Sequence, residues 1–349
     1  MKRKLNSATP LSILMNIILI INVVIVLYPV LFTISSSFSL NNSLGASSII
    51  PFTDEDDTYV MNKCEACEGS GFILKDEEQF TCDVCKGSGE KGRLVAKFSF
   101  KKPSLYQYRR LLTDSDADVQ RSDAEIAAGV PSAKGTNYKR WYLNTLLIAC
   151  MNTILTVIIC TTAGYIFSRF QFTGKKQIMS GMIILQMFPS FIGMVATYAI
   201  LNKLNALDTL WGLVLVYASG SIPFNSQLMK GYFDTMPKDI AEAAYIDGAS
   251  PLVAYVRVIL PAAKPQIVFL TLTSFTGPWM DYIFPRMVLR SDNMKTLAVG
   301  LYEMISGRSN DNFTMFAAGA ILVAVPFAIL FLAGQKSLLQ SLAGTSGKE

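Results

Sequence analysis

The fold of this chain is decided by the stretch Asp239-Ile-Ala-Glu-Ala-Ala-Tyr-Ile-Asp-Gly248, which Val258-Ile-Leu-Pro261 follows at a fixed distance. The pattern predicts two short helices joined by a sharp turn. Asp239 and Glu242 resemble a capping box at the start of the first helix, and Gly248 can adopt the positive φ that ends it. A Ser-Pro pair then offers a second helix start, and Pro261 is expected to stop that helix. Glu242 is therefore expected as an exposed anion beside small residues, where an arginine of another protein can pair with it.

The composition around this stretch is that of a membrane protein. The chain has 349 residues, of which 51% are hydrophobic and only 16% are charged, whereas a soluble domain has about a quarter charged residues. The net charge of +5 is not gathered into a nucleic-acid patch. Histidine, the commonest general acid and base, is absent, and no nucleophile–base arrangement is recognisable. These observations argue against a nucleic-acid-binding protein and against an enzyme.

Six segments are long and apolar enough to cross a bilayer, which takes about 20 apolar residues per helix. They are Leu11–Ile34, Leu143–Phe167, Ile178–Leu201, Leu210–Met229, Ile267–Leu289 and Phe313–Leu332. The first follows a basic start, but it is too long for a signal peptide and no small-residue cleavage site follows it, so we interpret it as a retained anchor. The predicted fold class is therefore an all-α polytopic membrane protein with six transmembrane helices.

Basic residues set the predicted orientation. With the N-terminus in the cytoplasm, the short inner segments hold twelve Lys and Arg residues and the short outer segments hold five, as the positive-inside rule requires. The C-terminus is then cytoplasmic as well, and Glu242 lies in a cytoplasmic loop, residues 230–264. The predicted parts are cytoplasmic ends at 1–10 and 336–349, a first helix at 11–34, an extracytoplasmic loop at 35–141 and a core of five helices at 142–335.

Further motifs sharpen the interpretation of the region from about 141 to 349. They are Asn144-Thr-Leu, Ala163-Gly-Tyr-Ile-Phe-Ser-Arg-Phe170, Leu185-Gln-Met-Phe-Pro189, Ile222-Pro-Phe-Asn225 and Phe275-Thr-Gly-Pro-Trp-Met-Asp281. Together with the pattern E-A-A-x3-G-x9-(I/V)-x-L-P, they resemble the smaller permease of carbohydrate ABC importers, in particular of the maltose/maltodextrin type. The resemblance implies a type I importer fold in a bacterial cytoplasmic membrane.

The resemblance also implies partners. They are a second homologous permease, two ATP-binding subunits, an extracytoplasmic sugar-binding protein, an oligosaccharide substrate and membrane lipid. In such importers the cytoplasmic loop inserts into a cleft of the ATPase, which assigns the coupling contact to Glu242, Ala243, Ala244, Asp247, Gly248, Leu260 and Pro261. The chain has no phosphate-binding motif of the form G-x-x-x-x-G-K-[ST], so ATP is expected to be used only by partner subunits. Importers of other sugars or solutes look similar, which leaves the substrate open.

Two polar residues, Asn225 and Asp281, are expected on the translocation path. A carboxylate deep in lipid is costly, so Asp281 is expected either at a wet gate near the outer end of its span or in a paired or snorkelling structural role. Gly and Pro residues interrupt the spans. They are explained either by ordinary helix packing or by backbone breaks that line the path.

A cysteine repeat departs from the family pattern. Cys64-Glu-Ala-Cys67-Glu-Gly-Ser-Gly recurs as Cys82-Asp-Val-Cys85-Lys-Gly-Ser-Gly, and paired C-x-x-C units at this spacing indicate zinc. Four thiolates suit a closed structural zinc site, so a zinc-knuckle-like insertion is predicted at 64–89. It resembles half of the cysteine-rich region of Hsp40-type chaperones. Because the predicted location is extracytoplasmic, two disulfides are an alternative, as is thiol exchange or metal sensing.

The repeat leaves a different class of function open, in which the chain is a membrane-anchored zinc or thiol module and its helices are a scaffold. The 239–261 pattern argues against this, because a scaffold needs no ATPase-docking loop. The remaining cysteines, Cys150 and Cys160, lie in an apolar segment and are expected to pack there.

Overall fold

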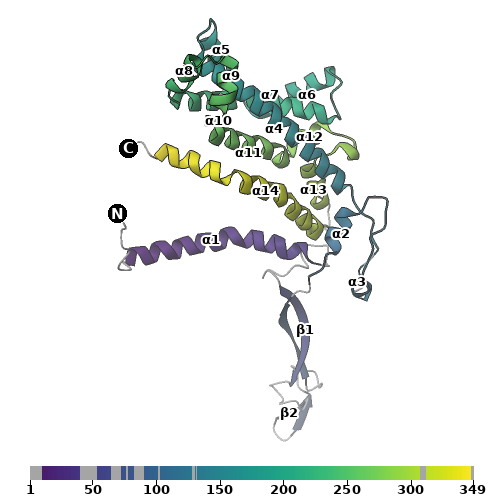
Figure 1. Ribbon diagram of the computed structural model, residues 1–349. Helices are drawn as coiled ribbons and strands as arrows, with labels where there is room; N and C mark the ends of the chain where they lie inside the picture. Colours follow the sequence, from purple (N-terminus) through teal and green to yellow (C-terminus); the bar gives the residue numbers. More distant parts are fainter. Residues whose placement is uncertain are drawn as a thin grey trace. The chain divides into compact units, whose positions relative to one another are not determined.

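The computed structural model describes residues 10–39, 53–63, 72–75, 78–81, 90–100, 103–127, 130, 132–306 and 312–346. The chain divides into two units (Figure 1). One unit consists of Met1–Gln107 with Ser309–Ala318, and the other of Tyr108–Arg308 with Gly319–Glu349. The second unit holds the residues that matter for function.

The first unit begins with α1 (Pro10–Ser37), a helix of 28 residues without a charged side chain. Its Leu, Ile and Val side chains are exposed along most of its length. Its polar side chains bond to its own backbone: the Asn22 amide donates to the Ile18 carbonyl at 3.2 Å, and the Thr33 hydroxyl donates to the Pro29 carbonyl at 2.8 Å. Such a helix suits lipid, since these polar groups need no water, and it covers the first predicted span.

Four strands pair within the region that the sequence predicts as a long loop. β1 (Thr53–Lys63) is antiparallel to β4 (Glu90–Phe100), with a register from Thr53 opposite Phe100 to Lys63 opposite Glu90. β2 (Phe72–Lys75) is antiparallel to β3 (Glu78–Thr81). The sequence does not predict these strands. The rest of the described chain is helical where it is regular, as the all-α prediction requires.

The second unit and the end of the chain are built from helices of very different lengths. Their bounds are α2 (Tyr106–Leu112), α3 (Asp123–Ala127), α4 (Tyr138–Arg169), α5 (Lys175–Gln186), α6 (Ser190–Lys203), α7 (Leu210–Thr235), α8 (Asp239–Ile246), α9 (Pro251–Ala254), α10 (Leu260–Ala262), α11 (Lys264–Met280), α12 (Ile283–Val288), α13 (Leu297–Ile305) and α14 (Phe313–Ser346). A π-helical turn, Tyr255–Ile259, joins α9 to α10, and a 3₁₀ turn, Asp292–Met294, precedes α13.

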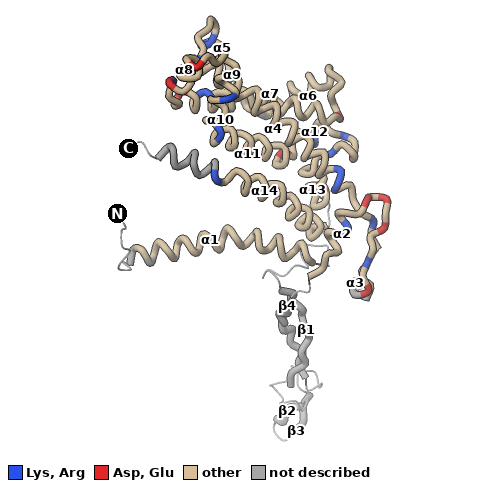
Figure 2. Tube along the Cα trace, in the orientation of Figure 1, with Lys and Arg blue, Asp and Glu red and all other residues tan. Residues whose placement is uncertain are grey.

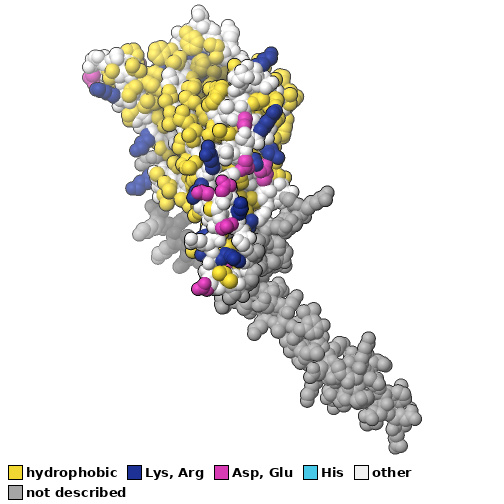
Figure 3. All heavy atoms as spheres, turned by 90° about the vertical axis from the view of Figure 1, so that its right-hand side faces the viewer, with side chains coloured by type: hydrophobic (Ala, Val, Ile, Leu, Met, Phe, Trp, Pro, Cys, Tyr) yellow, Lys and Arg dark blue, Asp and Glu magenta, His cyan; other side chains and the backbone are white. Residues whose placement is uncertain are grey.

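Three described helices are long and apolar enough to cross a membrane: Leu14–Ser37, Tyr138–Arg169 and Phe313–Lys336. The count rises to five if each of two bent helix pairs is one span. The predicted span Leu210–Met229 lies in α7, which is about 39 Å long at 1.5 Å per residue but is too polar to meet the same criterion. Charged residues of α4, α7 and α11 fall toward the helix ends (Figure 2), and hydrophobic side chains spread over much of the surface in Figure 3. The chain is therefore a multi-pass membrane protein.

Two predicted spans are not single helices. Residues 178–201 are divided between α5 and α6, which meet at an angle of 106°. The break falls just before Pro189, which has no N–H to donate within a helix. The predicted span Ile267–Leu289 ends at Met280, and the chain restarts as α12. There the Asp281 carboxylate accepts a hydrogen bond from the Phe284 N–H at 3.3 Å, so it satisfies a donor at the start of α12.

The core of the second unit forms where α4 packs along α7 and α11. Gly164 of α4 lies close against α7, since a Cβ atom built on it lies 2.5 Å from the Cβ of Met229. Small residues at such positions let membrane helices approach closely. Around this contact, Cys160, Tyr165, Met229, Phe233 and Ile259 form a buried cluster.

Replacing Gly164 with leucine is expected to destabilise the protein by about 1–3 kcal/mol, because the new side chain overlaps the α7 backbone. The measurement is the thermal unfolding midpoint of the purified protein in detergent. Gly220→Leu is the matched control, since nothing lies within 4 Å of a Cβ at Gly220 on α7. Equal midpoints for the two variants would contradict the assigned contact.

Candidate functional site

Residues 230–264, which the sequence predicts to contact an ATPase and which are called the coupling loop below, carry a helix–turn–helix. The prediction that Asp239 caps the first helix is wrong. Asp239 is the first residue inside α8, and the cap position is held by Lys238 without a side-chain hydrogen bond. Asp239 and Glu242 lie instead in the first helical turn, where the helix dipole favours anions. Glu242 is exposed, as predicted.

The turn after α8 has the predicted geometry. Gly248 adopts φ +83°, and its N–H donates to the Tyr245 carbonyl at 3.0 Å while the Ala249 N–H donates to the Ala244 carbonyl at 2.9 Å. This pair of bonds is a Schellman motif, which places a left-handed residue directly after the helix. The Ser250 hydroxyl then accepts from the Val253 N–H at 3.4 Å, at the start of α9.

Pro261 does not stop the second helix as predicted. The chain continues helically through α10 to Ala262. The turn before it is widened, because the Leu260 N–H donates to the Tyr255 carbonyl five residues back instead of four. Pro261 has no N–H to donate to the carbonyl four residues back. The π-helical turn directly precedes the segment that lacks this donor. The helix direction changes after Ala262, by 78° between this segment and α11.

The coupling loop exposes large apolar side chains together with charged ones. Ile246 is 86% exposed and Leu252 is 71% exposed, and Glu242, Ala243 and Asp247 are exposed beside them. Ala244, which the sequence assigns to the same surface, is buried at 8% and therefore packs within this chain. Exposed large apolar side chains rimmed by charge are typical of a protein–protein contact.

An aromatic contact joins the coupling loop to α4. Tyr165 of α4 stacks on Tyr255 with ring centroids 4.7 Å apart, and its hydroxyl lies 3.4 Å from that of Tyr245 in α8. The Tyr255 hydroxyl donates to Thr161 at 3.2 Å. One turn further along α4, the Arg169 guanidinium donates to the carbonyls at the end of α7, those of Phe233 and Met236. These contacts join α8 to α4, and α4 to the end of α7.

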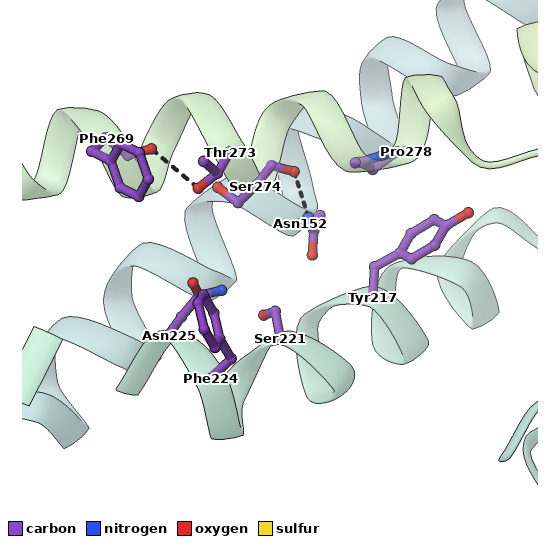
Figure 4. A pocket seen from close by; sticks show the side chains of 10 residues that line it. Asn152, Tyr217, Ser221, Phe224, Asn225, Phe269, Thr273, Ser274 and Pro278 are labelled. Carbon is purple, nitrogen blue, oxygen red and sulfur yellow. Dashed lines mark hydrogen bonds between the residues drawn. The ribbon is translucent and has the colours of Figure 1, made fainter. Parts of the chain in front are cut away.

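A pocket of about 320 Å³ lies between α4, α7 and α11. It is lined by Asn152, Tyr217, Ser221, Phe224, Asn225, Phe269, Thr273, Ser274, Gly277 and Pro278 (Figure 4). The Asn152 amide donates to the Ser274 carbonyl at 2.8 Å, and the hydroxyl of the lining residue Ser221 lies 3.0 Å from that of Thr156. Asn225, one of the two residues predicted on the path, is thus placed in a cavity between helices.

Asp281, the other predicted path residue, does not line this pocket. It accepts a hydrogen bond from the Tyr217 hydroxyl at 2.9 Å in addition to the one from Phe284. Of the two roles predicted for Asp281, these contacts support the paired structural role. Tyr217 itself lines the pocket, so Asp281 orients one of the lining side chains.

A set of hydrogen bonds holds the 289–306 segment to the rest of the unit. Asp208 accepts hydrogen bonds from the backbone N–H groups of Arg290 and Ser291 at 2.9 and 3.0 Å, and from the Ser291 hydroxyl. From α4, the Trp141 indole N–H donates to the Asp292 carbonyl at 2.9 Å, and the Asn144 amide donates to two more carbonyls of the segment. Sequence reasoning missed these links, because they join residues that are far apart in the chain.

The charge of Asp208 is stabilised by these contacts. Burial alone would raise the pKa of the Asp208 carboxyl, but the hydrogen bonds from Ser291 and from the Arg290 N–H outweigh it and lower the pKa below its ordinary value. Hydrogen bonding to the ionised form produces this direction of shift.

The predicted metal site is not among the residues that the structure describes, since Cys64, Cys67, Cys82 and Cys85 all lie outside them. Within the described ranges, no group of three or more His, Cys, Asp or Glu side chains is arranged to hold a metal ion. Cys150 is exposed and Cys160 is buried, both on α4. The buried Cys160 packs in the α4–α7 cluster, as predicted.

Residues 157–340 match the family described as binding-protein-dependent transport system inner membrane component. The chain belongs to this family. The matched range contains the coupling loop, the 289–306 segment and every lining residue of the pocket except Asn152. The predictions of a membrane subunit of an importer and of a chain that is not an enzyme are thereby confirmed.

Relatives and a solved structure agree with this membership. The maltodextrin transport system permease protein MdxG of Bacillus subtilis is 42% identical over 214 residues, which are 61% of this chain and 77% of the relative. The galactooligosaccharides transport system permease protein GanQ of the same organism is 36% identical over 64% of this chain and 78% of its own length. A bacterial ABC transporter involved in the import of the acidic polysaccharide alginate has a similar fold, with a TM-score of 0.64 at 20% identity over 94% of this chain and 96% of that chain.

Replacing Asp208 with asparagine is expected to lower the stability of the protein by about 1 kcal/mol at pH 7, because the carboxylate no longer attracts its donors. The pKa of Asp208 is lower in the folded than in the unfolded state, so its contribution is present above about pH 4 and is lost as the pH falls through the folded pKa. Thermal unfolding from pH 7 to pH 3 is the measurement.

The difference in unfolding midpoint between wild type and Asp208→Asn should shrink as the pH is lowered. Asp116→Asn, which changes an exposed carboxylate in the same way, is the control and should leave the midpoint unchanged. A difference that stays constant with pH would refute the charged role of Asp208.

Proposed function

We propose that this chain is one of two permease subunits of an ATP-driven importer for uncharged oligosaccharides of the maltodextrin type. Family membership supports the importer class, and relatives named for maltodextrin transport, at up to 42% identity, support the substrate. The single observation that carries the mechanism is the coupling loop, in which a charged and apolar helix–turn–helix is exposed at the end of α4 and α7.

In this proposal the coupling loop docks on a separate ATP-binding subunit. Ile246 and Leu252 enter an apolar cleft of that subunit, and Glu242 pairs with a basic side chain there. The contact is completed by Ala243, Asp247, Gly248, Leu260 and Pro261, while Ala244 supports α8 from within. Closure of two ATP-binding subunits then moves α8, and Tyr165 and Tyr255 pass the movement to the membrane helices.

The remaining partners belong to the same assembly. A second, homologous permease completes the path across the lipid bilayer, and an extracytoplasmic binding protein delivers the oligosaccharide. Asn225 lies on the path and Asp281 supports it through Tyr217. The six proposed spans are α1, α4, α5 with α6, α7, α11 with α12, and α14, with both chain ends and the coupling loop in the cytoplasm.

Charge reversal at Glu242 tests the coupling role. Glu242→Lys is expected to leave the protein in the membrane but to reduce co-purification of the ATP-binding subunits and uptake of labelled maltotriose at least tenfold, since an interface charge pair is replaced by repulsion. Asp116→Lys, an equal charge change in an exposed loop distant in sequence, is the control and should transport normally. Normal uptake by Glu242→Lys would end the proposed role of the loop.

The substrate is tested separately, in cells that lack this chain and any redundant maltodextrin importer. Maltotriose uptake that returns with the wild-type chain supports the maltodextrin assignment. If uptake is the same with and without the chain, the importer has another substrate, and galactooligosaccharides are the next to test because of the relative GanQ.

For the cysteine repeat we propose a structural zinc ion bound by Cys64, Cys67, Cys82 and Cys85. Support comes from the register of the strands on either side. Lys63 pairs with Glu90 in one ladder and Phe72 pairs with Thr81 in the other, and along the sequence one C-x-x-C unit falls between β1 and β2 and the other between β3 and β4. Four cysteines in two such units suit tetrahedral zinc.

Elemental analysis of the purified chain should find about one zinc per chain, and Cys64→Ser with Cys67→Ser should remove it. Cys150→Ser is the control, because this cysteine lies on α4. Thiol counting under denaturing, non-reducing conditions provides the second readout. Two disulfides, with no zinc, would contradict the proposal.

A further inference from the structure

The pocket between α4, α7 and α11 has the chemistry of a ligand site. On α7, Tyr217, Ser221 and Asn225 occur at intervals of four residues, which places them on one helix face. On α11, Phe269 and Thr273 are spaced in the same way. Figure 4 shows these two rows projecting into the space between the helices.

The amide of Asn225 is a polar group that has not found a partner within the described part of the chain. The other amide of the pocket, Asn152, donates to the Ser274 carbonyl and accepts from the Thr156 hydroxyl at 3.3 Å. Asn225 makes no such bond with any described residue, although it lies in the middle of a helix between membrane helices. An amide without a hydrogen-bond partner is unfavourable in an apolar medium. The amide therefore calls for a polar occupant rather than lipid.

Aromatic rings lie beside this amide. Phe224 is 60% exposed and Phe269 is 40% exposed, and both line the pocket. A pyranose ring offers hydroxyls at its edge and a carbon-bound apolar face, so an amide next to phenyl rings matches both of its surfaces. The described lining contains no Lys, Arg, Asp or Glu, which favours an uncharged sugar over an acidic one.

We propose that this pocket is a sugar-contact site of this permease itself, in which Asn225 hydrogen-bonds the hydroxyls of one uncharged pyranose unit while Phe224 and Phe269 pack on its carbon face. This assignment depends on the proposed importer function, and it specifies where the substrate would contact this subunit. A volume of about 320 Å³ is near the lower end of ligand sites. The pocket therefore takes a short part of an oligosaccharide at a time and guides it during transit.

The test uses the complete importer, with both permeases, the ATP-binding subunits and the binding protein, in proteoliposomes with labelled maltotriose. Three quantities are measured: sugar transported, ATP hydrolysed and the amount of second permease that co-purifies. Asn225→Ala and Phe269→Leu should each lower the sugar transported per ATP about two- to tenfold, the range expected for one lost hydrogen bond or contact. ATP hydrolysis and assembly should remain at the wild-type level.

Two further variants separate a sugar contact from a structural role. Phe269→Trp keeps an aromatic face and should transport better than Phe269→Leu. Phe331→Leu removes a phenyl ring that is 57% exposed on α14, outside the pocket, and should transport as the wild type does.

Wild-type ratios of sugar to ATP in both Asn225→Ala and Phe269→Leu would overturn the site and leave the importer function standing. Loss of the second permease from the complex would also overturn it, because the pocket would then be filled by a partner helix. A wild-type complex that imports only a non-sugar solute would overturn the proposed substrate and this site together.

Discussion

The close contact between α4 and α7 is the constraint on which the other features of this chain depend. α4 is a helix of about 48 Å at 1.5 Å per residue, and each functional region is attached to it. Trp141 bonds to the 289–306 segment, Asn152 lines the pocket and Tyr165 packs on the coupling loop. The absent side chain of Gly164 lets α7 lie against this helix. The three regions therefore share one rigid element.

The bonds that join α4 to its neighbours are numerous but individually weak. The Thr156 hydroxyl meets Ser221 of α7, and the Asn152 amide meets a carbonyl of α11. A hydrogen bond between membrane helices contributes about 0.6 kcal/mol on average. Contacts of this strength specify how the helices fit together, although each one alone adds little stability. By contrast, the aromatic stack of Tyr165 on Tyr255 and the bonds of Arg169 to α7 join the coupling loop to its helices through several contacts at once.

Local patterns in the sequence predicted the local structure well. Gly248 adopts the positive φ expected of it, Ser250 caps the second helix, and Glu242 is exposed. Hydropathy located the helical segments but not their breaks. An average over a window of apolar residues shows neither the missing N–H at Pro189 nor the acceptance of the Phe284 N–H by Asp281. Hydropathy also does not show that Asp239, the predicted N-cap, lies one residue inside its helix.

Features that depend on distant residues were not predictable from one sequence. The link from Asp208 to Arg290 and Ser291 joins segments that are about 80 positions apart, and nothing near Asp208 indicates it. The pairing of β1 with β4 was missed for the same reason: β1 begins with the polar run Thr-Asp-Glu-Asp-Asp-Thr, which lacks the alternation of a half-buried strand. Within the candidate site, Asn225 was found through its motif, whereas the pocket around it emerged only when α4, α7 and α11 were brought together.

The π-helical turn at Tyr255–Ile259 has a consequence for how this family's sequences can change in length. A π-helical turn holds one residue more than an α-helical turn, and removing that residue would rotate α9 by about 100° relative to α10. The Leu252 side chain would then point in a different direction relative to α11, while Gly248 and Pro261 would keep their own local geometry. The number of residues between Gly248 and Pro261 therefore determines the conformation of the loop. A single deletion there would change the shape of the loop more than most substitutions would.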